Sequence, residues 1–223
     1  MKKPMCTLAL IMALVVGSNA LAVVTLPEDD LNPAPFREGP GWTLQAWYWD
    51  TPETGVSPAD AEVDLNDYGT AVAEITVNGS AAWMPEYLGQ TGVFEVDRTE
   101  LSDLIITVPN VPQENYEKHV WVQMVFYADS GHVPNLYVIP EGDYSAYQVM
   151  TKVAEQAVDD NYLHVTYSLT LDFNPEWEYV FIRPGDCEMF VDSVIVETQC
   201  IPEPMSMVVL GLGSLLLRLR RKQ

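Results

Sequence analysis

The residues best suited to chemistry in this chain are aromatic rings and amides on the polar faces of two expected strands. Apolar and polar residues alternate over residues 119–127 and over residues 42–49. If the continuous apolar rows face the core, the opposite faces carry Trp, Tyr, His and Gln, which can stack on sugar rings and bond their hydroxyls. The glycan platform expected from this register consists of Gln45, Trp47, His119, Trp121, Gln123 and Tyr127. The alternative is that a second sheet, a loop or a tail covers these rings.

Signatures of catalysis are absent from the sequence. It contains no Gly-x-Ser-x-Gly, His-Glu-x-x-His, Cys-x-x-Cys or glycine-rich phosphate loop. Carboxylates suited to glycoside hydrolysis are so numerous that no pair is informative. His119, His132 and His164 could hold a metal, but nothing in their spacing sets their mutual distances. We therefore expect no catalytic residue and a protein that is not an enzyme.

The charge balance is strongly acidic, with 32 Asp and Glu against 11 Lys and Arg and a formal net charge of −21. The basic residues concentrate at the two ends of the chain, so the region between them is more acidic than the total suggests. Such a field repels phosphate backbones and anionic lipid surfaces, which excludes nucleic acid as an expected partner.

The N-terminus has the pattern of a secretory signal peptide over residues 1–22. Lys2 and Lys3 precede an apolar run from Leu8 to Val16, and Ala20 and Ala22 are small residues at the positions that signal peptidase requires. Nine apolar residues are too few to cross ~30 Å of hydrocarbon as a helix. We expect cleavage after Ala22 and export of the mature chain.

The C-terminus, residues 201–223, has three parts that follow one another closely. Pro202, Glu203 and Pro204 end the folded body, because two prolines continue neither a helix nor a strand. An apolar run of 13 residues, Met205 to Leu217, forms a short transmembrane anchor. Basic residues keep the chain end cytoplasmic and the acidic body outside: Arg218, Arg220, Arg221 and Lys222.

This tripartite tail resembles the PEP-CTERM sorting signal of Gram-negative-type bacteria. The resemblance implies processing by a membrane enzyme of the exosortase type and a place at the cell surface or in an exopolysaccharide matrix. Three pieces of the body are similar to uncharacterised planctomycete-type proteins with this tail: 66–70, 120–123 and 190–200. That second resemblance implies a shared fold and a shared cellular location, and no known activity.

The body, residues 23–200, is expected to be all-β, an antiparallel, jelly-roll-like β-sandwich. About ten strands with period-two alternation are separated by turn sequences rich in Gly, Pro, Asn and Asp. They are expected at 42–49, 71–77, 93–97, 104–108, 119–127, 136–139, 146–153, 162–171, 177–183 and 189–198. Residues 29–41 are expected to be an extended lead-in, and residues 50–67 a surface loop.

The closing strand also resembles the last strand of galactose-binding-like jelly rolls, some of which hold a structural Ca²⁺ nearby. That resemblance makes Asp192 a candidate ligand, the alternative being that it faces solvent or caps a loop. Cys187 and Cys200 flank this strand, and thirteen extended residues separate them by ~40 Å, whereas a disulfide needs Cα atoms within ~7 Å. We expect two unpaired thiols.

Together these features predict an exported, surface-sorted, non-enzymatic protein that associates with exopolysaccharide and binds carbohydrate. The first alternative is an exported carbohydrate-active enzyme, a lyase or hydrolase on a jelly roll. The second is a purely structural matrix protein whose acidic surface binds divalent cations.

Overall fold

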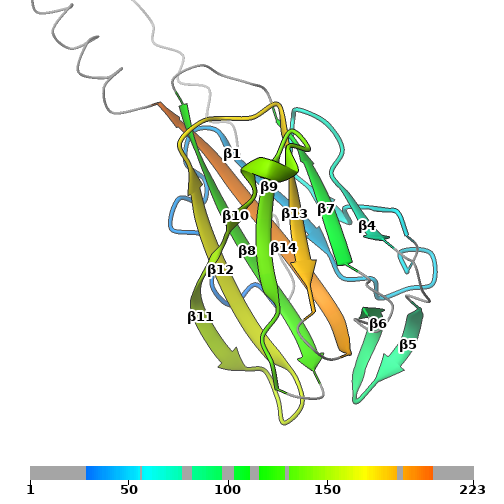
Figure 1. Cartoon of the computed structure of the whole chain (residues 1–223). Coiled ribbons are helices and arrows are strands. Elements are labelled where there is room, and N and C mark those ends of the chain that lie inside the picture. Colours follow the sequence, from blue (N-terminus) through cyan, green and yellow to red (C-terminus); the bar gives the residue numbers. More distant parts are fainter. Residues whose placement is uncertain are drawn as a thin grey trace, which may run out of the picture.

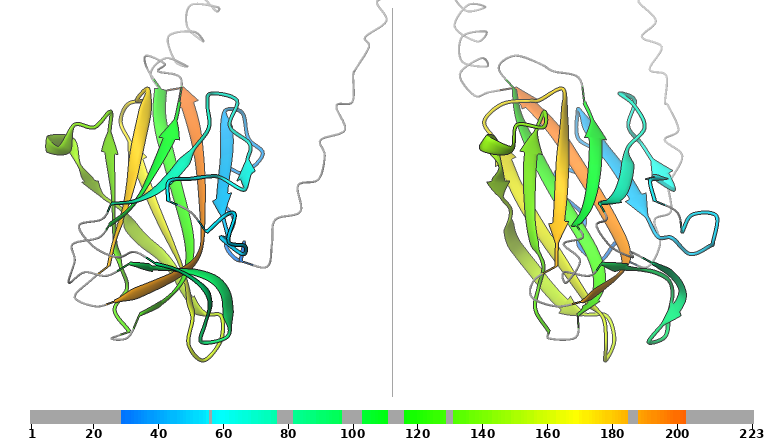
Figure 2. Two further views of the ribbon diagram at one scale, coloured as in Figure 1. Left: turned by 90° about the vertical axis from the view of Figure 1, so that its right-hand side faces the viewer. Right: turned by 45° about the vertical axis from the view of Figure 1, so that its right-hand side comes forward.

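The described part of the protein consists of two antiparallel β-sheets packed face to face (Figure 1). The structure is a computed structural model that describes residues 29–55, 57–76, 82–96, 103–110, 116–128, 131–184 and 188–202. The predicted all-β antiparallel sandwich is therefore confirmed. Figure 2 shows the two layers from the side, with the short 3₁₀ helix η2 (Tyr144–Ala146) projecting from one of them.

The larger sheet, sheet A, has the strand order β11-β12-β8-β14-β1-β3, and the hairpin of β5 and β6 joins it through β14. Its strands are β1 (Trp42–Trp47), β3 (Val63–Asp64), β5 (Trp83–Tyr87), β6 (Gln90–Val96), β8 (Tyr116–Ala128), β11 (Thr151–Ala157), β12 (Leu163–Leu171) and β14 (Met189–Pro202). The central strand, β14, pairs with β8 along its whole length and with β1 over residues 194–199.

The smaller sheet, sheet B, has the strand order β10-β9-β13-β7-β4-β2. Its strands are β2 (Ala59–Asp60), β4 (Val72–Thr76), β7 (Asp103–Pro109), β9 (Asn135–Pro140), β10 (Gln148–Val149) and β13 (Trp177–Arg183). In β13 the side chains of Val180 and Ile182 point into the sandwich and are fully buried, whereas Tyr179 on the opposite face is only half-buried. Sheet B therefore has one face in the core and one face toward solvent.

The core between the sheets is apolar along most of its length but contains an ion pair at one end. Lys118 of β8 and Glu178 of β13 are both fully buried, and Lys118 Nζ lies 3.2 Å from Glu178 Oε1. The ammonium is close enough for an ion pair but is not aligned as a hydrogen-bond donor, and neither oxygen of Glu178 has another hydrogen-bond partner. Burial raises the pKa of Glu178, and the neighbouring Lys118 opposes that rise.

The outer face of sheet A is covered by the N-terminal strap, residues 29–41. Glu197 on β14 is fully buried beneath it and accepts hydrogen bonds from the Ala34 N–H and from Trp42 Nε1, both at 2.9 Å. The Arg37 guanidinium holds both Glu197 oxygens at 2.6 and 2.7 Å and also pairs with Asp30. The predicted lead-in is thus an integral layer of the fold.

The hairpin β5–β6 covers the other end of the same face. Tyr87 stacks on Phe190 with ring centroids 3.7 Å apart, and its backbone carbonyl accepts a hydrogen bond from the Tyr162 hydroxyl at 2.9 Å. Val93 and Val125 complete a buried cluster with these rings. Strap and hairpin together bury much of a face that the alternation pattern leaves open.

Most predicted strands are present, and the differences concern short elements. The strand predicted over residues 146–153 is divided into the end of η2, β10 and β11, so that it contributes to both sheets. The loop predicted over residues 50–67 contains the two-residue strands β2 and β3. β5 was not predicted, because its sequence Trp-Met-Pro-Glu-Tyr includes a proline and lacks regular alternation.

Candidate functional site

The predicted platform is not a solvent-facing surface. In β1 the register is opposite to the predicted one: Trp47 lies in the core between the sheets, and Trp47 and Gln45 are both fully buried. Leu44 and Ala46, which were expected in that core, instead form a separate cluster with Ile195 on the strap side. The prediction failed because both faces of β1 are covered, so alternation does not distinguish inside from outside.

In β8 the register was predicted correctly, but the strap and the hairpin cover the polar face. Gln123 is fully buried, with its amide oxygen accepting from the Asn32 N–H at 2.8 Å. The indole of Trp121 donates to the Asn32 carbonyl at 2.9 Å, and the half-buried His119 packs edge-on against a phenylalanine of the strap. Tyr127 packs against the buried hairpin cluster. The alternative that a loop covers these rings is the correct one.

A different aromatic surface lies on the outer face of sheet B, which Figure 1 shows face-on. A groove there, with a volume of about 260 Å³, is lined by Tyr137, Ile139, Tyr144, Tyr147, Phe181 and Arg183. Phe181 and Ile139 are nearly buried and form its floor, whereas Tyr144 and Tyr147 are 63% and 56% exposed and form its wall. We call this the aromatic groove.

The floor of the groove follows from strand register. Tyr137 on β9 pairs directly with Phe181 on β13, so the two rings lie side by side on one face. Along β13 the row of aromatic rings continues with Tyr179 and Trp177. The ring centroids of Phe181 and Tyr179 are 5.9 Å apart, and those of Tyr179 and Trp177 are 4.6 Å apart. The aromatic surface therefore extends beyond the groove along the whole of β13.

The wall of the groove is held by a tight turn at the end of β9. Glu141 and Gly142 have φ angles of 49° and 70°, and the Asp143 N–H donates to the Pro140 carbonyl at 2.9 Å, as in a type I′ turn. A Cβ on Gly142 would lie 2.9 Å from the Trp177 ring, so the turn sits directly on that ring.

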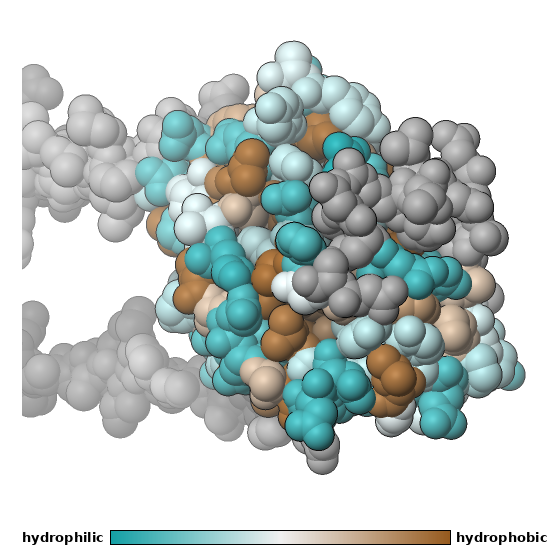
Figure 3. Space-filling view, turned by 60° about the horizontal axis from the view of Figure 1, so that its bottom comes forward, coloured by the Kyte–Doolittle hydropathy of each residue, from teal (hydrophilic) through white to brown (hydrophobic). Residues whose placement is uncertain are grey.

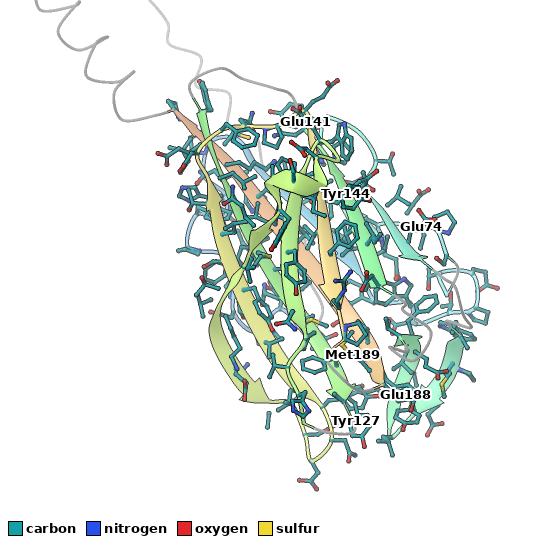
Figure 4. All side chains as sticks on the ribbon, in the orientation of Figure 1. Glu74, Tyr127, Glu141, Tyr144, Glu188 and Met189 are labelled. Atoms are coloured by element: carbon teal, nitrogen blue, oxygen red, sulfur yellow. The ribbon has the colours of Figure 1, made fainter. Side chains whose placement is uncertain are left out.

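Asp143 then caps the helical turn η2 that carries Tyr144. Its carboxylate accepts from the N–H and the hydroxyl of Ser145, and these bonds hold the pKa of Asp143 below its usual value. Figure 4 shows Tyr144 in front of sheet B and below Glu141. Tyr144 and Tyr147 pack edge-on against Phe181 and Tyr137, each with ring centroids 6.0 Å apart. The exposed rings are thus positioned before any ligand arrives.

A single cation lines the described part of the groove. Arg183 Nε and Nη2 bond the two oxygens of Asp103 at 2.8 and 2.6 Å, and the guanidinium lies 5.8 Å from the centre of the Tyr137 ring. The bonds to Asp103 raise the pKa of Arg183, which keeps the guanidinium charged. Asp103 therefore balances the charge of Arg183, while the remaining N–H groups of the guanidinium can still donate hydrogen bonds.

The sequence does contain a signal for this groove. Trp177, Tyr179, Phe181 and Arg183 alternate with residues that include two large aliphatics, which places three rings and a cation on one face of β13. The strand itself was predicted, but the alternation is more regular around residues 119–127 and 162–171, and this favoured a platform on sheet A. No signal in the sequence could have placed Tyr144 and Tyr147 beside β13, because that depends on the turn after β9.

The other end of the sandwich differs from the sheet-B face. Figure 3 views the molecule from below and shows the described apolar residues in small separate groups among hydrophilic ones. The aromatic groove is a hollowed apolar feature on which a ligand-binding hypothesis can be built.

Among the described residues, no three or more His, Cys, Asp or Glu side chains are grouped so that they could hold a metal ion. Asp192 is the extra residue of a β-bulge in β14 and is 7% exposed. Burial and the charges of three other aspartates raise its pKa to about 8. The expectation that Asp192 faces solvent is therefore wrong, and its role as a Ca²⁺ ligand stays a prediction.

Several predicted features lie outside the described residues. These are the signal peptide with Ala20 and Ala22, the residues Glu203 and Pro204, the basic cluster Arg218, Arg220, Arg221 and Lys222, and Cys187. Cys200 is a free thiol, with its sulfur 3.2 Å from Asn174 Oδ1. Within the described ranges, no helix has the length and apolar character that a membrane span requires.

No protein-family model matches the chain, and no curated protein sequence matches it either. Among solved structures, the CBM22-1 xylan-binding domain from Paenibacillus barcinonensis Xyn10C is 13% identical with a TM-score of 0.38, covering 57% of this chain and 86% of that domain. CBM28, a carbohydrate-binding module specific for non-crystalline cellulose, is 12% identical with a TM-score of 0.23, covering 70% of this chain and 84% of that module. Similarity at this level is too low to assign a family or a ligand.

Proposed function

We propose that this is an exported, surface-sorted, non-enzymatic protein that binds polysaccharide in the aromatic groove. The observation that carries the proposal is the groove itself, in which two exposed tyrosine rings stand over an apolar floor on the solvent face of sheet B. The predicted platform on sheet A plays no part, because its residues are covered.

The chemistry of the groove suits a sugar chain. Tyr144 and Tyr147 present flat faces for the C–H groups of sugar rings, and their phenolic hydroxyls can donate to and accept from sugar hydroxyls. Arg183 adds N–H donors at the side of the floor. Stacking surfaces, hydroxyls and a fixed guanidinium are binding groups, which supports a binding function over the alternative of a lyase or hydrolase.

Preorganisation also supports binding. The turn that carries Tyr144 is fixed by the Asp143 cap and by the contact of Gly142 with the ring of Trp177. Rings that are already ordered lose little conformational entropy when a ligand stacks on them. An open surface with such rings can retain a long chain molecule through many weak contacts.

The terminal segments supply the proposed location. Residues 1–22 would direct export through signal peptidase, and residues 201–223 would anchor the chain until an exosortase-type enzyme processes it. The body would then lie in the envelope or the extracellular matrix, where exopolysaccharide is the abundant ligand. The alternative of a purely structural acidic matrix protein does not account for the ordered aromatic groove.

The proposal can be tested by electrophoresis of the full chain through gels that contain soluble polysaccharides. The variant carrying Tyr144→Ala and Tyr147→Ala should bind about tenfold more weakly or worse, since each stacked ring contributes ~0.5–1.5 kcal/mol. Tyr68→Ala is the matched control, because Tyr68 is 41% exposed and does not line the groove. Wild-type protein that no polysaccharide retards, or a double variant that binds as tightly as Tyr68→Ala, would refute the proposal.

A further inference from the structure

We infer that the aromatic groove binds uncharged polysaccharide and discriminates against polyuronate chains, because Asp103 neutralises the guanidinium of Arg183. The inference rests on the proposed function and names the ligand class of the same site. It is carried by the geometry of this ion pair and by the carboxylates around the groove.

The Arg183–Asp103 pair is bidentate and is held in place. Two parallel N–H···O bonds of 2.8 and 2.6 Å join the guanidinium to the carboxylate, which comes from the neighbouring strand β7. The Asp103 side chain is 13% exposed, whereas that of Arg183 is 54% exposed. The fork of the guanidinium is thus occupied on one side by a carboxylate that is largely shielded from solvent.

This arrangement leaves Arg183 able to recognise hydroxyls but poorly able to recognise an acid. Its N–H groups on Nη1 are not used by Asp103 and can donate to sugar oxygens. A uronate carboxylate could reach only the Nη1 end of a guanidinium whose charge Asp103 already balances, and it would have to approach the negative charge of Asp103 itself. A hydroxyl has no charge and meets neither obstacle.

Other carboxylates near the groove have the same effect. The side chains of Glu141 and Asp143 flank the wall and are exposed. Glu141 Oε1 accepts a hydrogen bond from the N–H of Glu176 at 3.0 Å, and the side chain of Glu176 is exposed as well. Glu74 on β4 is exposed on the outer face of sheet B, as Figure 4 shows. An anionic chain therefore approaches a field of its own sign, in a protein whose net charge is −21.

The test compares retardation of the full chain by a neutral glucan, hydroxyethylcellulose, and by the polyuronate alginate, at low and at high NaCl. Wild-type protein should bind the glucan, with little dependence on salt, and bind alginate at least about threefold more weakly. Asp103→Asn frees the guanidinium and should raise alginate affinity about threefold or more at low salt, with the gain lost at high salt.

Glu74→Gln is the matched control, because it removes one negative charge from the same face without freeing Arg183. It should raise alginate affinity less than Asp103→Asn does. An equal gain in both variants would mean that the general field, and not the pair, sets the discrimination, and would overturn the inference. Thermal melting of each variant shows whether it is folded.

The two proposals fail in different ways. Wild-type protein that binds neither polymer refutes the proposed function. Wild-type protein that binds alginate as well as the glucan, through contacts that the double tyrosine variant loses, keeps the proposed function and overturns the inference. If Asp103→Asn does not fold, the inference is tested by the salt dependence of glucan binding to the wild-type protein. Glucan binding that is lost at high salt would overturn the inference.

Discussion

Substituting Glu197 by Gln should detach the N-terminal strap and destabilise the whole sandwich. Each carboxylate oxygen of Glu197 accepts two hydrogen bonds: Oε1 from the Ala34 N–H and Arg37 Nη2, and Oε2 from Arg37 Nε and Trp42 Nε1. An amide replaces one acceptor oxygen with a donor. Whichever way the introduced amide is turned, two N–H donors lose their acceptor, and Arg37 loses a counter-charge.

The magnitude follows from the burial of this pair. Removing one partner of a buried ion pair costs ~3–5 kcal/mol, and hydrogen bonds to charged groups contribute ~1.5–3 kcal/mol each. Arg37 keeps its second partner, Asp30, and its own side chain is 20% exposed, which favours the lower end of the range. We expect the free energy of unfolding to fall by about 3 kcal/mol, or the Tm by about 6–12 °C in a domain of this size.

Urea denaturation followed by tryptophan fluorescence is a suitable assay, because Trp42 and Trp121 both donate hydrogen bonds within this layer. Limited proteolysis should cleave the strap earlier in the variant than in the wild type. Glu155→Gln is the control, since the Lys152–Glu155 pair is exposed and its loss should cost ~0.5 kcal/mol or less. A Glu197→Gln protein that unfolds within about 1 kcal/mol of the wild type would show that the strap is not part of the cooperative fold.

Two further predictions concern buried charges in the sandwich. Lys118→Met or Glu178→Leu alone should lower the free energy of unfolding by ~3–5 kcal/mol, because each leaves one buried charge without its partner. The double variant should be about as stable as the wild type, since it buries no charge. Urea denaturation of all three variants measures this difference. Asp192 has a pKa of about 8 in the folded chain and 3.8 as its ordinary value, so the folded state holds a proton that the unfolded chain has released between these two pH values. The free energy of unfolding should therefore fall as pH rises from about 4 to 8. Asp192→Asn should be more stable than the wild type by roughly 2–5 kcal/mol at pH 8 and by much less at pH 4. The same gain at both pH values would contradict a raised pKa for Asp192.

Strands with a regular alternation of apolar and polar residues could be predicted from the sequence. β8, β12 and β13 were predicted nearly at their true positions, because large apolar residues at most alternate positions favour one face for the core. β14 was also predicted, although it extends to Pro202, where it pairs with Tyr116. β5 was not, since its interior proline conceals the pattern.

The candidate site was harder to predict than the strands that carry it. The platform on β1 and β8 combined residues whose faces prove to be buried from both sides, Trp47 by the opposite sheet and Gln123 by the strap. The groove on sheet B depends on the pairing of Tyr137 with Phe181 and on the turn that carries Tyr144. These residues are distant in sequence, so no local pattern connects them.

The all-β class, the acidic charge and, in strands without a bulge, the residues that share a face could all be read from the sequence. Period-two alternation and charge are local properties, which survive any arrangement of the strands. Which faces stay open depends instead on what packs over each strand in the folded protein: the strap covers Trp121, while nothing in the described chain encloses Tyr144 and Tyr147. A face is covered by segments that lie far away in the chain. The alternation pattern of the strand itself is the same whether its face is covered or open.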